Sequence, residues 1–243
     1  MSAINSGIGS TAPDFQIDQA NDVSVAISNP FNMFVKRMID VLGATAALIV
    51  LAPVFLLVAA LVKLSDPAGP VFYKQSRIGR GNRNIGVLKF RSMKWEYSTG
   101  PQRPYKTATQ AFEAMGRSDL CAEFEETQKV SNDPRVSRFG HLLRRTSLDE
   151  LPQLLNALFG HVSLVGPRPI ISQELERYGV EQSTYLSVKP GITGLWQVSG
   201  RSETGYDERV RLDVEYVRTW RLTLDLYILL RTVHTVVAQR GAY

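Results

Sequence analysis

The sequence is short of the residues that build disulfides and metal centres. Its 243 residues include one cysteine, Cys121, and three histidines, His141, His161 and His234. A single cysteine cannot form an internal disulfide, and the histidines are too far apart for the ligand spacing of a zinc site. We therefore expect the main domain to face a reducing compartment and to hold no Cys/His zinc centre.

Basic residues are absent from residues 1–35, which contain three acidic residues and are rich in Ser, Asn, Ala and Gly. A secretory signal starts with a positively charged segment, which this stretch lacks. Its polar, small-residue composition predicts a flexible tail over residues 1–33.

Several nucleotide-binding and nucleic-acid-binding signatures are missing as well. No GxxxxGK[ST] motif is present, and "GRGNRN" lacks the third glycine of a dinucleotide-binding loop. The aromatic residues do not alternate with the basic ones, and no helix-turn-helix, zinc or RNA-recognition pattern occurs. The formal net charge of +5 nevertheless favours anionic partners such as phosphates or a lipid surface.

The longest feature present is an apolar run over residues 41–62, which contains no charged residue. As a helix it would measure about 33 Å, close to the ~30 Å hydrocarbon core of a bilayer. Pro53, near the middle, removes a backbone hydrogen bond and favours a kink. Basic residues flank both ends, so the positive-inside rule gives no orientation. We expect residues 34–65 to form a re-entrant membrane helix bent at Pro53, with a straight span or a buried core helix as alternatives.

A basic segment follows the apolar run. Seven basic residues and no acidic residue lie between Pro67 and Trp95. The pattern predicts a β-hairpin with strands over 71–74 and 87–93, joined by a turn at Gly79, Gly81 and Asn82. Lys89 and Arg91 then share one face of the second strand. That face suits either anionic lipid headgroups or a phosphate clamp, and the pattern alone does not choose.

The acidic pair Asp149 and Glu150 lies in "RRTSLDELPQLLNALFG", residues 144–160. The leucines recur at helical spacing, which predicts a helix ending near residue 159. Ser147 and Glu150 have the spacing of a capping box, although Pro152 fits the first turn better if Asp149 is the cap. Either register leaves both carboxylates at a helix N-terminus, where the dipole keeps a carboxylate ionised and also attracts phosphate. Capping and catalysis both remain open.

Three further segments are singled out. The stretch "GHVSLVGPRPI" presents Arg168 between two prolines, and "VKPGITGLWQVSGR" carries Gln197 and Arg201 in a glycine-containing loop. Both suit contact with a phosphate or nucleotide, with a surface turn as the alternative. Residues 110–130 predict an acidic helix without chemistry. Residues 222–237 predict an amphipathic helix on the membrane plane, favoured over a soluble core helix.

Together "KFRSM", "DPRVSRFGHLLRRTSLDELPQLLNALFGHVSLVGPRP" and "KPGITGLWQVSGR" resemble the bacterial sugar transferase family of monotopic polyprenyl-phosphate hexose-1-phosphate transferases. The final "RGAY", the length and the single apolar helix resemble the undecaprenyl-phosphate galactose phosphotransferase type of exopolysaccharide pathways. The resemblance covers about residues 34–243, and several long motifs in the family order make it specific.

The resemblance implies an α+β fold in which residues 66–243 form a mainly helical cytoplasmic domain with a small β-hairpin and C-terminal interfacial helices. It implies transfer of hexose-1-phosphate from a UDP-sugar, galactose or glucose, to undecaprenyl phosphate in the bacterial inner membrane, with Mg2+ and release of UMP. Nucleic acid is not an expected partner, and a homodimer is compatible with the sequence without being argued by any pattern.

The family motif also assigns roles to residues. Asp149 would be the nucleophile and a metal ligand, and Glu150 would orient it or assist proton transfer. The expected substrate and phosphate contacts are Lys89, Arg91, Arg144, Arg168, Gln197 and Arg201. The family commonly has Ser-Pro at the helix break, whereas this chain has Ala52 and Pro53, which removes a hydroxyl that could satisfy freed backbone groups. The rival classes are a membrane-tethered basic scaffold and a nucleic-acid-binding protein without catalysis.

Overall fold

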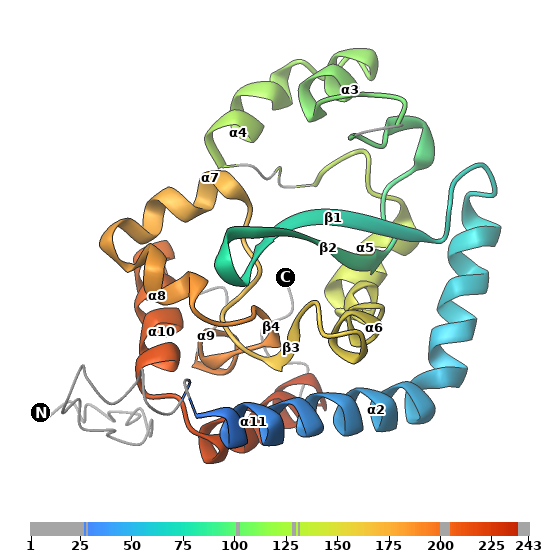
Figure 1. Ribbon diagram of the computed structural model, residues 1–243. Coiled ribbons are helices and arrows are strands. Elements are labelled where there is room, and N and C mark those ends of the chain that lie inside the picture. The colour runs from blue at the N-terminus through green and yellow to red at the C-terminus, as the bar shows by residue number, and fades with distance from the viewer. Residues whose placement is uncertain are drawn as a thin grey trace, which may run out of the picture.

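The computed structural model describes Ile27 and residues 29–100, 103–127, 130, 132–199 and 205–237. Most elements are helices, and the strands of this part of the chain form two two-stranded sheets (Figure 1). The elements follow the order α2 (Pro30–Ser65), β1 (Phe72–Gly79), η1 (Arg80–Asn82), β2 (Arg83–Phe90), η2 (Trp95–Tyr97), α3 (Ala108–Ala114), α4 (Asp119–Thr127), α5 (Arg138–Arg145), η3 (Leu148–Glu150), α6 (Gln153–Leu158), β3 (Ser163–Val165), α7 (Ser172–Leu175), η4 (Glu176–Glu181), α8 (Gln182–Leu186), β4 (Gly191–Thr193), α9 (Leu195–Ser199), α10 (Tyr206–Arg218) and α11 (Leu222–Val237).

Helix α2 is the long apolar element. Asn29 caps it by accepting hydrogen bonds from the amides of Phe31 and Asn32, at 2.9 and 3.4 Å, and Pro30 occupies the first turn, where its missing N–H costs nothing. The helix is long and apolar enough to cross a membrane, and only 11% of its most apolar window is buried. A core helix would be covered by protein, so that alternative does not fit. Of the tail predicted over residues 1–33, residues 1–26 and 28 lie outside the described part, and Pro30 already belongs to α2.

The path of α2 is visible in Figure 1, where its ribbon runs along the lower edge and then turns upward on the right. Both ends of the helix contact the same domain. At the N-terminal end the side chain of Asp40 accepts hydrogen bonds from the Ser163 hydroxyl and the Leu164 amide of β3, each at 2.8 Å. At the C-terminal end Val58 and Val62 are buried with Phe90 and Leu143. Several large apolar residues between these anchors are exposed, among them Ile49, Val50, Leu56 and Leu57, and others nearer the helix ends are exposed as well.

Strands β1 and β2 form the predicted antiparallel hairpin, with Gly81 and Asn82 in left-handed conformation at its tip. The strand limits differ from the prediction. Strand β1 spans 72–79 rather than 71–74, and β2 spans 83–90 rather than 87–93. The register pairs Tyr73 with Lys89 and Arg77 with Ile85. Directly paired residues share a face of the sheet, so Arg77, Val87 and Lys89 point to one side.

The second sheet joins β3 and β4 in parallel. It brings the "GPRP" segment against the "KPGITG" segment, because Gly191 and Gly194 approach the backbone of Gly166 so closely that a Cβ on either would overlap it. The sequence predicted that this glycine-containing loop contacts a phosphate or nucleotide, with its glycines letting the backbone approach the ligand. In the structure they admit another backbone segment instead, which fixes the position of the loop that carries Arg168.

The predicted acidic helix over residues 110–130 is two helices, α3 and α4. The chain breaks between them at Gly116, whose φ of 68° ends a right-handed helix. These helices lie at the top of Figure 1, away from α2.

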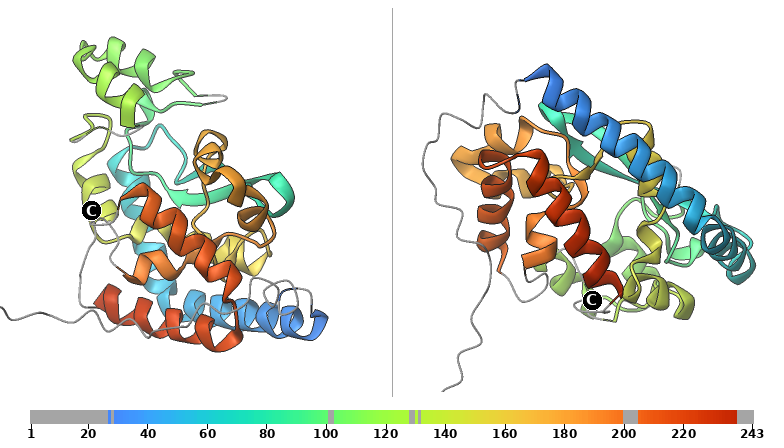
Figure 2. Two further views of the ribbon diagram at one scale, coloured as in Figure 1. Left: turned by 90° about the vertical axis from the view of Figure 1, so that its left-hand side faces the viewer. Right: turned by 90° about the horizontal axis from the view of Figure 1, so that it is seen from below.

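The C-terminal helices α10 and α11 complete the core. Tyr216 and Trp220 pack with Leu224 and Ile228 of α11 in the main hydrophobic cluster. Leu226, Leu230 and Val233 on another face of α11 stay 49%, 73% and 63% exposed, which leaves an apolar stripe at helical spacing. Seen from below, α2 and α11 lie uncovered on the same side of the molecule (Figure 2).

Candidate active site

The acidic pair lies in a short 3-10 turn between α5 and α6. Helix α5 ends at Arg145, and Ser147 then adopts a left-handed conformation with φ 56° that redirects the chain. Among the described residues no side-chain cap bond involves Ser147, so the capping box suggested by the spacing does not form. Both predicted registers are therefore wrong in detail, since α6 begins only at Gln153, after Pro152.

Glu150 pairs with Lys89 of β2 at the edge of a pocket. Lys89 Nζ lies 2.7 Å from Glu150 Oε1, and the two side chains are 20% and 37% exposed. Burial raises the pKa of the Glu150 carboxyl, but the positive charges of Lys89, Arg168 and Arg77 outweigh it and leave that pKa below its ordinary value. Glu150 is thus held ionised by the cations around it.

Asp149 is buried, with 8% of its surface exposed. Burial raises its pKa from 3.8 to about 6, while Lys89 and Arg144 lower it and the charge of Glu150 raises it further. At neutral pH Asp149 is a desolvated carboxylate with nearby cations, which is the state required of a nucleophile toward phosphorus. The Arg144 guanidinium is held in place by a 2.9 Å hydrogen bond from its Nε to Ser92 Oγ.

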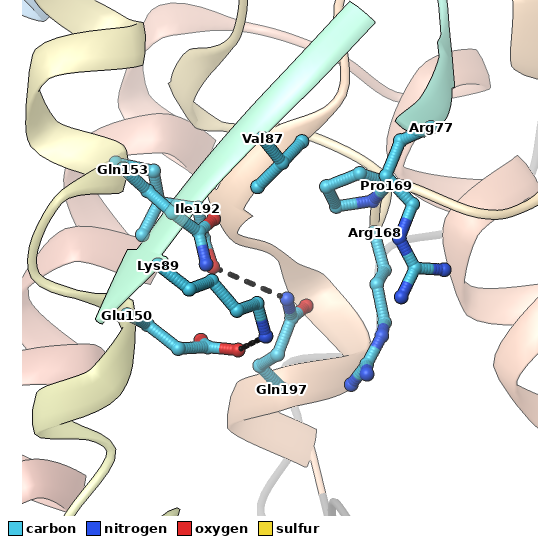
Figure 3. Close-up of a pocket in the computed structure, with 9 residues that line it drawn as sticks. All are labelled: Arg77, Val87, Lys89, Glu150, Gln153, Arg168, Pro169, Ile192 and Gln197. Carbon is cyan, nitrogen blue, oxygen red and sulfur yellow. Dashed lines mark hydrogen bonds and ion pairs between the residues drawn. The ribbon is translucent and has the colours of Figure 1, made fainter. Parts of the chain in front are cut away.

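A pocket that opens to solvent lies beside this turn. Arg168 lines it from the loop after β3, and Gln197 lines it from α9 (Figure 3). The Tyr185 hydroxyl donates a 3.0 Å hydrogen bond to the Arg168 carbonyl, and the Arg168 guanidinium lies 5.7 Å from the centre of the Trp196 ring. The complete lining is Arg77, Val87, Lys89, Glu150, Gln153, Arg168, Pro169, Ile192 and Gln197.

The structure does not bring every expected residue to this pocket. Arg91 pairs with Asp66 at the end of α2, with 2.5 Å between its Nη1 and Asp66 Oδ2, and also donates to the Asp66 carbonyl. It lies beyond the end of β2, so the expected alternation with Lys89 does not continue to it. Arg201 lies outside the described residues.

Arg77 lines the pocket but was not predicted as a site residue; the sequence pattern included it only among the seven basic residues between Pro67 and Trp95. The signal was present in the hairpin. Arg77 shares a face with Lys89 once the register of the two strands is known, and both reach the same pocket. Gln153 was missed for another reason, since a glutamine in the first turn of a helix has no distinctive pattern.

The carboxylates could also serve a metal. Within the described ranges no group of three or more His, Cys, Asp or Glu side chains could hold an ion. Mg2+ is commonly bound by one or two carboxylates together with substrate phosphates and water. The neighbouring Asp149 and Glu150 fit that donor set, with Glu150 already committed to Lys89.

Comparison with known proteins confirms the family resemblance. The family model described as bacterial sugar transferase matches residues 31–239. The exopolysaccharide production protein ExoY of Rhizobium meliloti (strain 1021) is 44% identical over 214 residues, which is 88% of this chain and 90% of that protein.

Two longer relatives match over part of their length. The undecaprenyl-phosphate galactose phosphotransferase of Salmonella typhimurium is 43% identical over 86% of this chain and 42% of its own length. The UDP-glucose:undecaprenyl-phosphate glucose-1-phosphate transferase of Escherichia coli (strain K12) is 40% identical over 87% of this chain and 42% of its own length. With a family model spanning nearly all of its described fold, the chain belongs to the bacterial sugar transferase family, whose members are phosphoglycosyl transferases.

Proposed function

We propose that this enzyme transfers hexose-1-phosphate from a UDP-sugar to undecaprenyl phosphate and releases UMP, the initiating step of exopolysaccharide assembly. The names of the relatives support this reaction, and they cover galactose and glucose as the sugar. The observation that carries the proposal is the buried Asp149 carboxylate beside a pocket lined by Lys89, Arg77 and Arg168. A basic scaffold does not require a desolvated carboxylate at that position.

The proposed chemistry has two steps. An oxygen of Asp149 attacks the phosphorus next to the sugar, and the bond from that phosphorus to the bridging oxygen breaks, so that UMP leaves with the bonding electrons. A phosphosugar-aspartate remains. A phosphate oxygen of undecaprenyl phosphate then attacks the same phosphorus, the aspartyl bond breaks, and Asp149 is restored as a carboxylate.

The cations of the site lower the barrier to both steps. Lys89, held by Glu150 at 2.7 Å, and the Arg168 guanidinium would face negative charge on the diphosphate. Arg144, fixed by Ser92, would offset the charge of the attacking carboxylate before the substrate arrives. Glu150 would orient Lys89 and the neighbouring aspartate, or assist a proton transfer.

Mg2+ would be held by Asp149, with most of its remaining ligands supplied by the diphosphate and water. When bound, it would neutralise charge on the phosphate oxygens.

We further propose that α2 is a re-entrant membrane helix bent at Pro53, with the domain on the cytoplasmic face of the bacterial inner membrane. Two anchors support this arrangement. Lys36 near one end of α2 pairs with Asp225, and Asp66 just after the other end pairs with Arg91, all within one domain. A straight span would place these ends on opposite sides of the membrane. The exposed stripe of α11, Leu226, Leu230 and Val233, would rest on the membrane plane.

The test is an assay of purified protein with undecaprenyl phosphate, Mg2+ and a panel of UDP-sugars, read as UMP release and sugar transfer to lipid. Asp149→Asn should eliminate turnover, because an amide supplies no attacking oxyanion. Wild-type protein incubated with donor alone should retain labelled sugar phosphate at Asp149. The matched control Asp119→Asn, an exposed carboxylate on α4, should behave as wild type. Absence of turnover with every donor, as expected of a scaffold or a nucleic-acid-binding protein, would overturn the proposal.

A further inference from the structure

The charged side chains that line the active-site pocket lie on two sides of it, and Glu150 is influenced by the cations of both sides. Lys89 and Glu150 occupy one side, next to Asp149. The side chains of Arg77 and Arg168 lie on the other side (Figure 3), and the charge of Arg168 lowers the pKa of Arg77. Arg77 comes from β1 and Arg168 from the loop after β3, so two unrelated segments direct the same functional group to one place.

This second side of the pocket carries more positive charge than the protein compensates. Glu174 Oε2 lies 3.4 Å from Arg77 Nη1, and its other oxygen lies 3.8 Å from Arg209 Nη1. The same carboxylate accepts a 3.0 Å hydrogen bond from the Ile171 amide. The Glu174 carboxylate is thus shared by two guanidinium groups and an amide. Asp213 also lies near Arg168 and Arg209, but burial raises its pKa to about 7, so it compensates them only in part at neutral pH. Burial and the charges of Arg168 and Arg209 both lower the pKa of Arg77, while Glu174 raises it.

Such a cluster is matched to a ligand with more than one negative charge. The Arg77 side chain is only 14% exposed, and a partly buried cation without full compensation costs free energy. A phosphate offsets that cost, and a guanidinium can donate two parallel hydrogen bonds to its oxygens. Two guanidinium groups fit the phosphate of UMP, which becomes a terminal group with two negative charges once the bond to the second phosphorus breaks.

We propose that Arg77 and Arg168 bind the phosphate that leaves with the nucleoside, whereas Lys89 faces the phosphate attacked by Asp149. This inference rests on the proposed function, since it divides the donor diphosphate between the two sides of the pocket. It makes Arg77 a substrate-binding residue that acts on donor and on released UMP alike. Loss of Arg77 should therefore weaken UMP binding, whereas loss of Lys89 should mainly slow the formation of the phosphosugar-aspartate.

The experiment measures binding of UMP, and separately of uridine, to the full chain with saturating Mg2+. Arg77→Gln should weaken UMP binding about tenfold or more, in line with a lost charge-assisted contact. Uridine, which has no phosphate, should bind Arg77→Gln as it binds wild type. Arg77→Lys should fall between the two, because an ammonium group keeps the charge but loses the paired geometry. The matched control Arg83→Gln, an exposed arginine on the same hairpin, should leave both affinities unchanged.

Two results would overturn the inference: wild-type affinity for UMP in Arg77→Gln, or an equal loss of UMP and uridine binding, which indicates a structural role. If Arg77→Gln does not fold, as judged by its melting transition, Arg77→Lys decides, and an unchanged UMP affinity in that variant rejects the role. A wild-type chain that binds no UMP also rejects it. Sugar transfer is assayed separately, so a chain that transfers sugar phosphate while Arg77 proves neutral keeps its proposed function.

Discussion

Lys36 Nζ lies 2.6 Å from Asp225 Oδ2, and this ion pair joins the long apolar helix α2 to the C-terminal helix α11. Asp225 is 2% exposed and also accepts a hydrogen bond from the Tyr216 hydroxyl at 2.7 Å. A buried carboxylate with several donors holds one geometry, because any displacement leaves charge unpaired in a poorly solvated place. The N-terminal part of α2 is thus fixed to the catalytic domain.

Arg91 and Lys89 lie two residues apart and should respond to substitution in different ways. Arg91→Gln leaves Asp66 without its charged partner at the end of α2, so the free energy of unfolding should fall by about 3 kcal/mol, typical of a broken buried pair. Lys89→Gln should slow turnover strongly and change the melting temperature little, because that pair is more exposed. Melting curves and steady-state kinetics on both variants check this. A normal melting temperature together with a raised KM in Arg91→Gln would return Arg91 to phosphate binding.

The pKa of Asp149 predicts a pH dependence of both activity and stability. The folded-state pKa of about 6 lies above the ordinary 3.8, so the folded protein binds this proton more tightly than the unfolded chain does. The stability contribution is therefore fully present below about pH 4 and is lost as the pH rises through 6. Relative to Asp149→Asn, wild type should lose on the order of 3 kcal/mol between these limits. Denaturant unfolding of both proteins at pH 4, 5, 6 and 7 measures the difference.

The ionisation of Asp149 should affect activity in the opposite direction, because only the ionised carboxylate attacks phosphorus and activity therefore rises as the pH rises through 6. The kcat/KM for the donor should fall about tenfold per pH unit below 6. Lys89→Gln removes a charge that lowers the pKa of Asp149, so the acid limb of the pH–rate profile should move to higher pH. Glu150→Gln removes a charge that raises this pKa, so the acid limb should move to lower pH. An acid limb that stays in place in both variants would mean that another group titrates.

Substitutions of Ser147 and Glu150 distinguish a role in helix capping from a role in catalysis. Since Ser147 has φ 56° and no side-chain cap bond, Ser147→Gly should raise the free energy of unfolding by about 0.5–1 kcal/mol by relieving the left-handed strain. Ser147→Ala should cost less than the ~1 kcal/mol lost with a true N-cap. Glu150→Gln should keep the melting temperature and lose about 100-fold in rate. Near-normal turnover of that variant at saturating Mg2+ and both substrates would leave Asp149 as the catalytic carboxylate of the pair.

The sequence predicts those parts of the fold that short-range patterns determine. The turn residues Gly81 and Asn82 locate the hairpin, the apolar run locates α2, and the helical spacing of residues 222–237 matches α11. The two ends of the hairpin are less predictable. Arg91 continues the strand pattern in the sequence, but its pairing with Asp66 depends on where α2 ends.

The site is predicted where its residues follow one another and missed where they meet only in space. Asp149 and Glu150 stand out because they are adjacent in a motif. Arg77 joins them only through the pairing of β1 with β2, and the burial that raises the pKa of Asp149 comes from packing that no spacing encodes. The capping-box pattern was misleading because Ser147 in left-handed conformation cannot cap.

The proposed membrane insertion of α2 gives the last two predictions. Ile49, Val50, Leu56 and Leu57 are 59–74% exposed, on the stretch of α2 that surrounds Pro53. If α2 enters the bilayer as proposed, a charged side chain near the bilayer centre raises the free energy of membrane insertion by about 2.5–3.5 kcal/mol. The double variant Ile49→Arg/Leu57→Arg should therefore shift protein from the membrane fraction to the soluble fraction. The control Val180→Arg, at a residue that is 94% exposed on η4, should leave the distribution unchanged.

The direction of the chain through the bilayer is tested with epitope tags at the N-terminus and near residue 100. In wild type both tags should be reachable from the cytoplasm alone, because the ion pairs of Lys36 and Arg91 hold both ends of α2 on one domain. Pro53→Ala restores a helical hydrogen bond and favours a straight helix, but the Lys36 anchor opposes that change. The outward-facing fraction should therefore be small in Pro53→Ala and larger in Pro53→Ala/Lys36→Met, where straightening no longer has to break the pair. An N-terminal tag already exposed outside in wild type would refute the re-entrant helix and establish a span.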